Sequence, residues 1–186
     1  MAFRKLRPPT TPPRKIAPGN LGIIQAFCNS PHVGNRLDNP DALADWLVEK
    51  GLANDTSVVT YKAFRDALQL RDDFRTVLRL RRGEPWPQDV LARLNEPVDW
   101  HYRVRVDERG HLHRTAQLPA EWPGVRQRLI SFMHRAIAEK NWTRLHFCEN
   151  DVCPWIFYDG TNGQRGRWCR PKCGNVHIQR KFRRRA

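Results

Sequence analysis

Four cysteines near the C-terminal end have the residue type and spacing of a metal site. Cys148 and Cys153 are separated by four residues, Cys169 and Cys173 by three, and fifteen residues lie between the two pairs. Thiolates are preferred ligands of Zn²⁺, and two short loops that each supply a pair can place four sulfurs about 2.3 Å from one ion. The spacing therefore predicts one structural zinc, with no coordination position left open for catalysis.

Other uses of these cysteines are two disulfides, two unrelated buried pairs or an iron–sulfur cluster. The sequence has neither a secretion signal nor an apolar run of the roughly 20 residues that span a bilayer, so we expect a cytoplasmic protein with no membrane partner. Reducing conditions there favour metal ligation over disulfides. His146 and His177 lie close to the pairs, but four cysteines already complete a zinc shell. Cys28 stands alone.

Positive charge is confined to the two ends of the chain. Residues 1–20 hold five basic residues and 165–186 hold nine, with no acid in either, and together they equal the net charge of +14. Between them, 21–164 are neutral, with 19 basic and 19 acidic residues. Segregated charge indicates a polyanionic partner, DNA or RNA, although basic ends can also serve solubility alone. The candidate contacts are Arg165, Arg167, Arg170, Lys172, Arg180, Lys181, Arg183, Arg184 and Arg185.

The elements that must position these residues follow from periodicity and local signals. We expect a Pro-rich basic arm at 1–20, a mostly helical domain at 21–141 and a zinc finger with a basic C-terminal helix at 142–186. Within the domain, 21–28 is a strand or a helix. Expected helices cover 40–51, 57–81, 88–95 and 124–141, and the alternation at 100–117 predicts a hairpin turning near 108–110. The fold class is α+β and mainly helical.

The finger itself is too small to have a core of its own without the metal. Gly174 and Asn175 follow the last cysteine, and either can take the left-handed conformation that lets a zinc knuckle turn into the next element. A short basic helix is expected from Val176 to Arg185. Trp155, Phe157 and Trp168 could stack on unpaired bases, but we expect them to pack inside the finger instead.

These residues resemble a known family. The stretch with Cys148, Cys153-Pro-Trp, Phe157-Tyr-Asp, Arg167-Trp-Cys and Cys173-Gly-Asn is similar to the CGNR zinc finger. Upstream, Phe27-Cys-Asn-Ser and the Pro-started helix at 39–51 are similar to the ABATE domain that precedes this finger in stress-induced transcription regulators. The chain departs from the pattern in its shorter last cysteine pair and in Val176, which replaces the arginine of the CGNR tetrapeptide.

The resemblance implies a treble-clef- or ribbon-like finger that binds DNA and an upstream domain that senses a ligand. For such a ligand pocket, Asn29 and His32 are the candidates. No enzymatic signature is present, and His101, His111 and His113 are more readily explained as exposed strand residues, so we expect no enzyme. The alternatives are a ligand-binding domain or a protein-interaction module whose finger is only structural, and redox sensing by the cysteines. A small-molecule effector and a homodimer are both compatible with the sequence.

Overall fold

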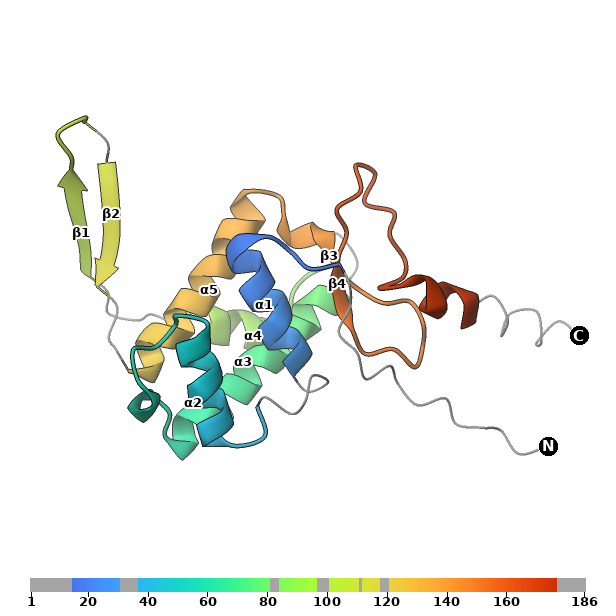
Figure 1. Cartoon of the computed structure of the whole chain (residues 1–186), viewed down its shortest axis with the longest axis horizontal. Coiled ribbons are helices and arrows are strands. Elements are labelled where there is room, and N and C mark those ends of the chain that lie inside the picture. Colours follow the sequence, from blue (N-terminus) through green and yellow to red (C-terminus); the bar gives the residue numbers. More distant parts are fainter. Residues whose placement is uncertain are drawn as a thin grey trace, which may run out of the picture.

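The computed structural model describes residues 15–30, 37–80, 84–96, 101–110, 112–117 and 121–176. The chain is mainly helical, with one antiparallel hairpin that stands apart from the helices and a finger at the C-terminal end (Figure 1). Within the described ranges, no helix is both long and apolar enough to cross a bilayer.

The first two helices begin and end close to where local signals place them. The apolar run that could have been a strand is helix α1 (Gly19–Asn29). Helix α2 (Pro40–Glu49) begins after Asn39, whose side chain accepts a hydrogen bond from the Ala42 N–H, and proline occupies the first turn. Gly51 follows with φ +65°, the left-handed conformation that glycine adopts at low cost. The capping prediction for α2 is confirmed.

Helix α3 (Tyr61–Arg79) begins four residues later than the sequence pattern indicated. Residues Thr56–Val58 form a separate 3₁₀ turn, η2, which Asp55 caps by accepting a hydrogen bond from the Ser57 N–H, and the extended backbone of Val59 separates it from α3. Thr60 then caps α3 by accepting a hydrogen bond from the Ala63 N–H. Local capping by side chains therefore overrode the apolar periodicity that favoured one long helix.

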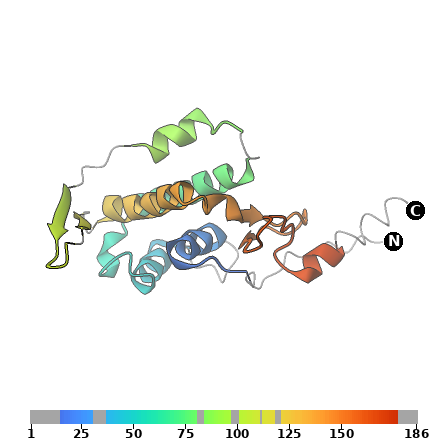
Figure 2. The same ribbon diagram turned by 90° about the horizontal axis from the view of Figure 1, so that it is seen from above.

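Helices α1, α3 and α5 build the core. Helix α5 (Trp122–Ala138) contacts α1 and α3, α1 also contacts α3, and α2 packs on α3. Helix α4 (Gln88–Leu94) lies on the side of α3 and α5 opposite α1 and α2 (Figure 2). Val125, Leu129, Met133 and Ile137 have the spacing of one helical face of α5; the first three are buried, whereas Ile137, next to the last residue of the helix, is 41% exposed.

The predicted hairpin is present as β1 (His101–Val106) and β2 (Leu112–Gln117), paired antiparallel from His101↔Gln117 to Val106↔Leu112. Its turn lies where the sequence placed it, with Gly110 at φ +77°. The hairpin projects away from the helices at the end of the molecule opposite the finger (Figures 1 and 2). It therefore takes no part in positioning the cysteines.

A second hairpin joins the helical part to the finger. After the 3₁₀ turn η3 (Trp142–Arg144), strand β3 (Leu145–Phe147) pairs with β4 (Ile156–Tyr158). Alternate residues of a strand face opposite sides. Accordingly Leu145 and Ile156 belong to the core of the helical part, while Trp155 and Phe157 pack with the four finger cysteines. One hairpin is thus a wall shared by two apolar clusters.

Candidate metal centre

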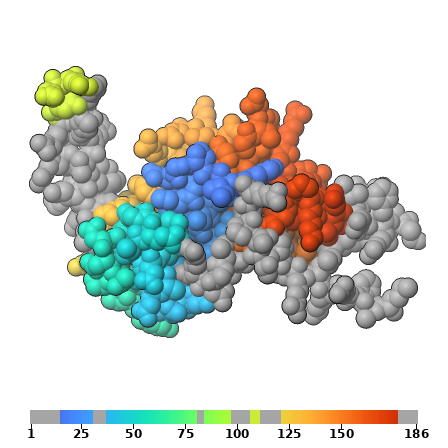
Figure 3. All heavy atoms as spheres, viewed as in Figure 1, coloured from blue at the N-terminus to red at the C-terminus, as the bar shows by residue number. Residues whose placement is uncertain are grey.

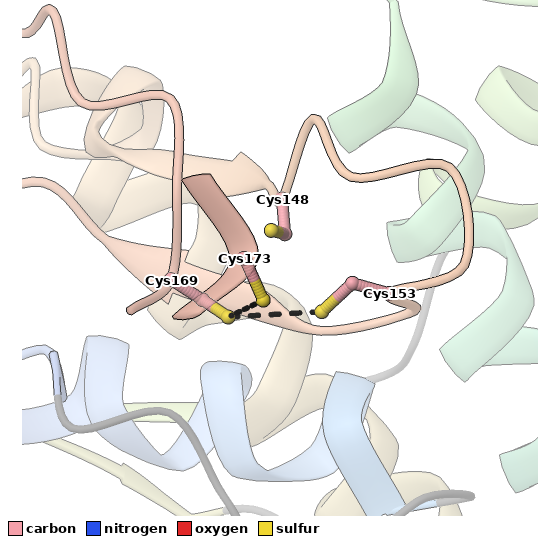
Figure 4. A group of neighbouring side chains, drawn as sticks. All are labelled: Cys148, Cys153, Cys169 and Cys173. Atoms are coloured by element: carbon pink, nitrogen blue, oxygen red, sulfur yellow. Dashed lines mark hydrogen bonds between the residues drawn. The ribbon is translucent and has the colours of Figure 1, made fainter. Parts of the chain in front are cut away.

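The sulfur atoms of the four clustered cysteines point toward one another (Figure 4). They all lie within 4.8 Å of one another, and both the Cys153–Cys169 and Cys169–Cys173 Sγ distances are 3.6 Å. Sulfurs about 2.3 Å from one tetrahedral zinc are about 3.8 Å apart, whereas a disulfide requires about 2.05 Å. The prediction of four convergent thiols is confirmed, and the arrangement can hold one zinc ion.

Short backbone hydrogen bonds shape the loops that present the ligands. The Cys148 N–H donates to the Trp155 carbonyl at 2.9 Å, extending the β3–β4 pairing by one step, and the Cys153 N–H donates to the Asn150 carbonyl at 2.7 Å. On the second loop, the Cys173 N–H donates to the Arg170 carbonyl at 3.1 Å, within the turn that opens a helix at 171–176. In each pair, the first cysteine therefore lies shortly before a tight turn, and the second cysteine is the last residue of that turn.

Crowding the four thiols together makes the site receptive to a cation. Hydrogen bonds from Cys153 and Cys169 lower the pKa of Cys148. The hydrogen bond to Cys148 raises the pKa of Cys153 and, in the same way, of Cys169. A positive charge among the sulfurs, which Zn²⁺ supplies when it is bound, favours the thiolate form of the ligands. By contrast, Cys28 is fully buried in α1, and burial raises the pKa of its thiol to about 12.

The aromatic residues of the finger pack inside it, as expected. Trp155 and Phe157 are fully buried beside the cysteines, and Trp168 is partly buried against the same cluster. A Cβ on Gly174 would lie 3.0 Å from the Trp168 ring. Neither Gly174 nor Asn175 adopts the left-handed conformation that the sequence allows, since neither has positive φ. Both belong to the helix at 171–176, which starts five residues before the predicted one, and Gly174 serves close packing instead.

Two of the arginines proposed as nucleic-acid contacts hold the finger together. The Arg167 guanidinium binds the Glu149 carboxylate at 2.6 and 2.7 Å, and the Glu149 N–H donates to the Arg167 carbonyl at 2.9 Å. Glu149 directly follows Cys148, and Arg167 lies two residues before Cys169. The Glu149–Arg167 ion pair therefore ties one ligand loop to the other. Arg170 donates a hydrogen bond to the Cys169 thiol. Both arginines thus act on the metal loops themselves.

The loop between the two ligand pairs is organised by a buried carboxylate. Asp159 accepts hydrogen bonds from the Thr161 N–H and hydroxyl at 3.0 and 2.8 Å and from the Gly166 N–H at 2.6 Å. Burial opposes its ionisation, but these hydrogen bonds outweigh burial and the pKa of Asp159 is lowered. One side chain therefore closes the loop from 159 to 166.

A methyl group at Gly166 should disrupt this loop. A Cβ there would lie 2.8 Å from the Asp159 carboxylate, which its hydrogen bonds hold in place, so we expect Gly166→Ala to destabilise the finger by about 1–3 kcal/mol. Gly163→Ala is the matched control, because its Cβ would meet only the flexible Arg165 side chain at 3.4 Å. Urea unfolding followed by tryptophan fluorescence compares the two. Equal stabilities would show that Asp159 does not organise the loop.

Helix α1 holds the finger through amide side chains. Asn29 Nδ2 donates to the Ile156 carbonyl at 2.8 Å, and the Ile156 N–H donates to Asn29 Oδ1 at 2.9 Å. Gln25 Nε2 adds a bond of 3.2 Å to the same carbonyl. The Arg75 guanidinium of α3 bridges the carbonyls of Cys28 and Pro154 at 2.6 and 3.4 Å. The helical part and the finger are therefore joined by a buried polar clamp.

This clamp changes the expected role of Asn29. The residue is 3% exposed, and both groups of its amide bind the backbone of β4, so in this structure its side chain holds the finger. His32, the other expected pocket residue, lies outside the described residues. Sequence reasoning missed Gln25 and Arg75, because their partners are 131 and 79 residues away along the chain and no local pattern connects them.

The remaining candidate nucleic-acid contacts divide into two groups. Arg165 and Lys172 are exposed on the finger, on either side of Cys169. The five basic residues of 180–185 lie outside the described residues, as does the expected helix beyond 176. Among the described residues, the four cysteines are the one group of three or more possible metal ligands that converge, and His146 does not join it.

Family comparisons cover nearly the whole described chain. Residues 23–139 match the ABATE family, described as "putative stress-induced transcription regulator", and residues 144–186 match the CGNR zinc finger, in the order expected from the sequence. Neither description names an enzymatic activity. A search of curated proteins found no match. Because the first match alone spans 117 of the 186 residues, the chain belongs to the ABATE family and ends in a CGNR zinc finger.

Proposed function

We propose that the protein is a zinc-dependent regulator of transcription that binds duplex DNA through its finger. The observation that carries this proposal is the convergence of four thiols, two of which lie in the cationic segment that begins at Arg165. Asp159 is the last acidic residue, and nine basic residues follow from Arg165 onward. A metal held there fixes the loops that display Arg165 and Lys172 and fixes the start of the basic tail.

Charge sets the kind of binding to expect. Arg167 and Arg170 hold the metal loops, so seven cations of the finger and tail are left to contact phosphates. Each neutralised phosphate contributes about −0.9 to the slope of log affinity against log salt, which gives a slope of about −6. Such binding is strong at low salt and reads the phosphate backbone more than the base sequence.

Fluorescence anisotropy with a labelled random-sequence duplex tests the proposal. The zinc-loaded chain should bind at low salt with this slope, and removal of zinc by a chelator should weaken binding at least tenfold, because the loops lose their shape while the net protein charge stays positive. Readdition of zinc should restore affinity. Affinity that is absent at low salt, or unchanged by chelation, would contradict the proposal. Competition with double-stranded RNA and with an acidic peptide separates DNA from the other polyanions.

We also propose that the helical part senses a small molecule at its junction with the finger. A hollow of about 320 Å³ lies between the start of α1 and the end of α5, and Tyr158 of β4 contributes to its wall. A ligand there would touch both parts of the chain. The test is a screen for compounds that raise the unfolding temperature: a compound acting here should lose its effect in Phe132→Ala and should alter DNA affinity. Compounds that bind without changing DNA affinity would contradict sensing.

A further inference from the structure

An open hollow of about 630 Å³ lies between the end of α3 and the first ligand loop of the finger. Its wall consists of Arg79 from α3, Phe147 from β3 and the loop at 148–154. Helix α1 packs on β4, where blue and orange spheres meet in Figure 3, whereas α3 packs on β3. The hollow shares no residue with the smaller one between α1 and α5, and its size is typical of small-molecule sites.

Arg79 contributes a positive charge to this hollow. The residue is exposed, and its guanidinium lies 4.7 Å from the centre of the Phe147 ring. Among the described residues, no carboxylate or carbonyl oxygen accepts a hydrogen bond from it. The guanidinium of Arg75 lies 5.1 Å from the centre of the same ring and is already bound to two carbonyls. Two cations beside one ring favour an anionic group in contact with Arg79, whose N–H donors are available.

The first ligand loop contributes a negative charge and a buried acceptor. Asp151 is exposed and, within the described ranges, forms no ion pair, either with Arg79 or with another cation. Glu149, the other acid of the wall, is bound by Arg167. Asn150 is 5% exposed, and its Oδ1 accepts no hydrogen bond from the part of the chain that the structure describes. Because a buried acceptor without a donor is unfavourable, a ligand that donates here is favoured.

We propose that this hollow binds a free amino acid or a zwitterion of similar size. The ligand carboxylate binds the guanidinium of Arg79, and the ligand ammonium group donates to Asp151 and to Asn150 Oδ1. Val152 and Pro154 are half-buried in the wall and supply apolar surface for the ligand side chain. A phosphate or a dicarboxylate fits less well, since it brings additional negative charge toward Asp151.

Ligand binding in this hollow is linked to the metal centre. The loop that forms most of the wall also carries the ligands Cys148 and Cys153, so zinc and the amino acid stabilise the same conformation. By thermodynamic linkage, the amino acid strengthens zinc binding by the same factor by which zinc strengthens amino-acid binding. The proposal therefore rests on the zinc site and is independent of DNA binding.

Calorimetric titration of the zinc-loaded full chain with each of the twenty α-amino acids, at up to about 10 mM, tests the proposal. At least one should bind with one-to-one stoichiometry. Arg79→Ala and Asp151→Asn should each weaken that binding at least tenfold, because each leaves one charge of the ligand without its partner. Arg65→Ala and Asp45→Asn are matched controls, since they remove exposed charges at the other end of α3 and on α2, and should keep the wild-type affinity.

Two further measurements define the ligand and the linkage. The analogues of the bound amino acid that lack its amino group or its carboxylate should bind at least tenfold more weakly, and the amino acid should slow the removal of zinc by a chelator. Phe132→Ala, which alters the hollow between α1 and α5, should change neither result. Zinc content shows whether each variant is folded, and the nearly isosteric Asp151→Asn decides the matter if Arg79→Ala loses its zinc.

The proposal is overturned if none of the amino acids binds, or if binding is unchanged in a zinc-loaded Arg79→Ala or Asp151→Asn chain. Equal affinity for the analogues would exclude recognition of a zwitterion, and zinc loss that is no slower with the amino acid would exclude the linkage. Binding that is lost in Phe132→Ala but kept in Arg79→Ala would assign the ligand to the other hollow. Each of these results holds whatever the affinity of the chain for DNA.

Discussion

Cys169→Ser should abolish stoichiometric zinc binding and unfold the finger. A serine hydroxyl is not ionised near neutral pH and cannot replace a thiolate ligand. Cys169 also makes both of the 3.6 Å sulfur contacts described above, so the substitution removes a central member of the group. A structural zinc site contributes about 10–16 kcal/mol to the folding of a small module. Within the described part of the finger, the aromatic residues that pack around the metal are Trp155, Phe157 and part of Trp168, which cannot offset that loss.

Zinc content after dialysis against a weak chelator measures the first effect, and the rate of proteolysis at Arg165 and Arg167 measures the second. Cys28→Ala is the matched control, because this buried cysteine of α1 is outside the metal group and its removal should leave zinc content unchanged. A Cys169→Ser protein that keeps one equivalent of zinc and resists proteolysis would refute the assignment of this ligand.

Asn29→Ala should separate the finger from the helical part without removing its metal ligands. The substitution leaves the buried N–H of Ile156 without its partner and leaves the carbonyl with only the longer bond from Gln25. Each unsatisfied buried group costs about 1–3 kcal/mol, so we expect the free energy of unfolding to fall by about 2–4 kcal/mol. Zinc content should stay at one equivalent, in contrast to Cys169→Ser.

Asn20→Ala is the control for this substitution, since Asn20 is exposed on the same helix. Urea unfolding gives the stabilities, and proteolysis in the presence of zinc shows whether the finger has become independent of the helices. An Asn29→Ala chain as stable as the Asn20→Ala chain would show that the clamp between α1 and β4 contributes little to the fold.

Features that depend on neighbouring residues could be predicted from the sequence. The caps of α2, the turn at Gly110 and the cysteine pairs are all set by residues a few positions apart, and each is present. Where two local signals competed, the prediction was less accurate: Asp55 and Thr60 delayed α3, and Gly174 was needed for contact with Trp168 and not for a left-handed turn.

Contacts between distant residues could not be predicted in this way. The sequence marks Asn29 as a polar residue at the end of an apolar run, which fits a pocket as well as a clamp, and only the packing of α1 on β4 decides between them. Likewise, net charge did not distinguish Arg165, which is exposed, from Arg167, which binds Glu149. The position of Lys15 beside Phe157 depends on how the whole chain folds.

The central claim is that Cys148, Cys153, Cys169 and Cys173 hold one zinc ion and thereby shape the cationic finger. X-ray absorption at the zinc edge, with metal analysis of the same purified full-length sample, tests it most directly. The account predicts one zinc per chain, surrounded by four sulfurs at about 2.3 Å. A first shell containing nitrogen or oxygen in place of a sulfur, or a folded finger that contains no zinc, would contradict it.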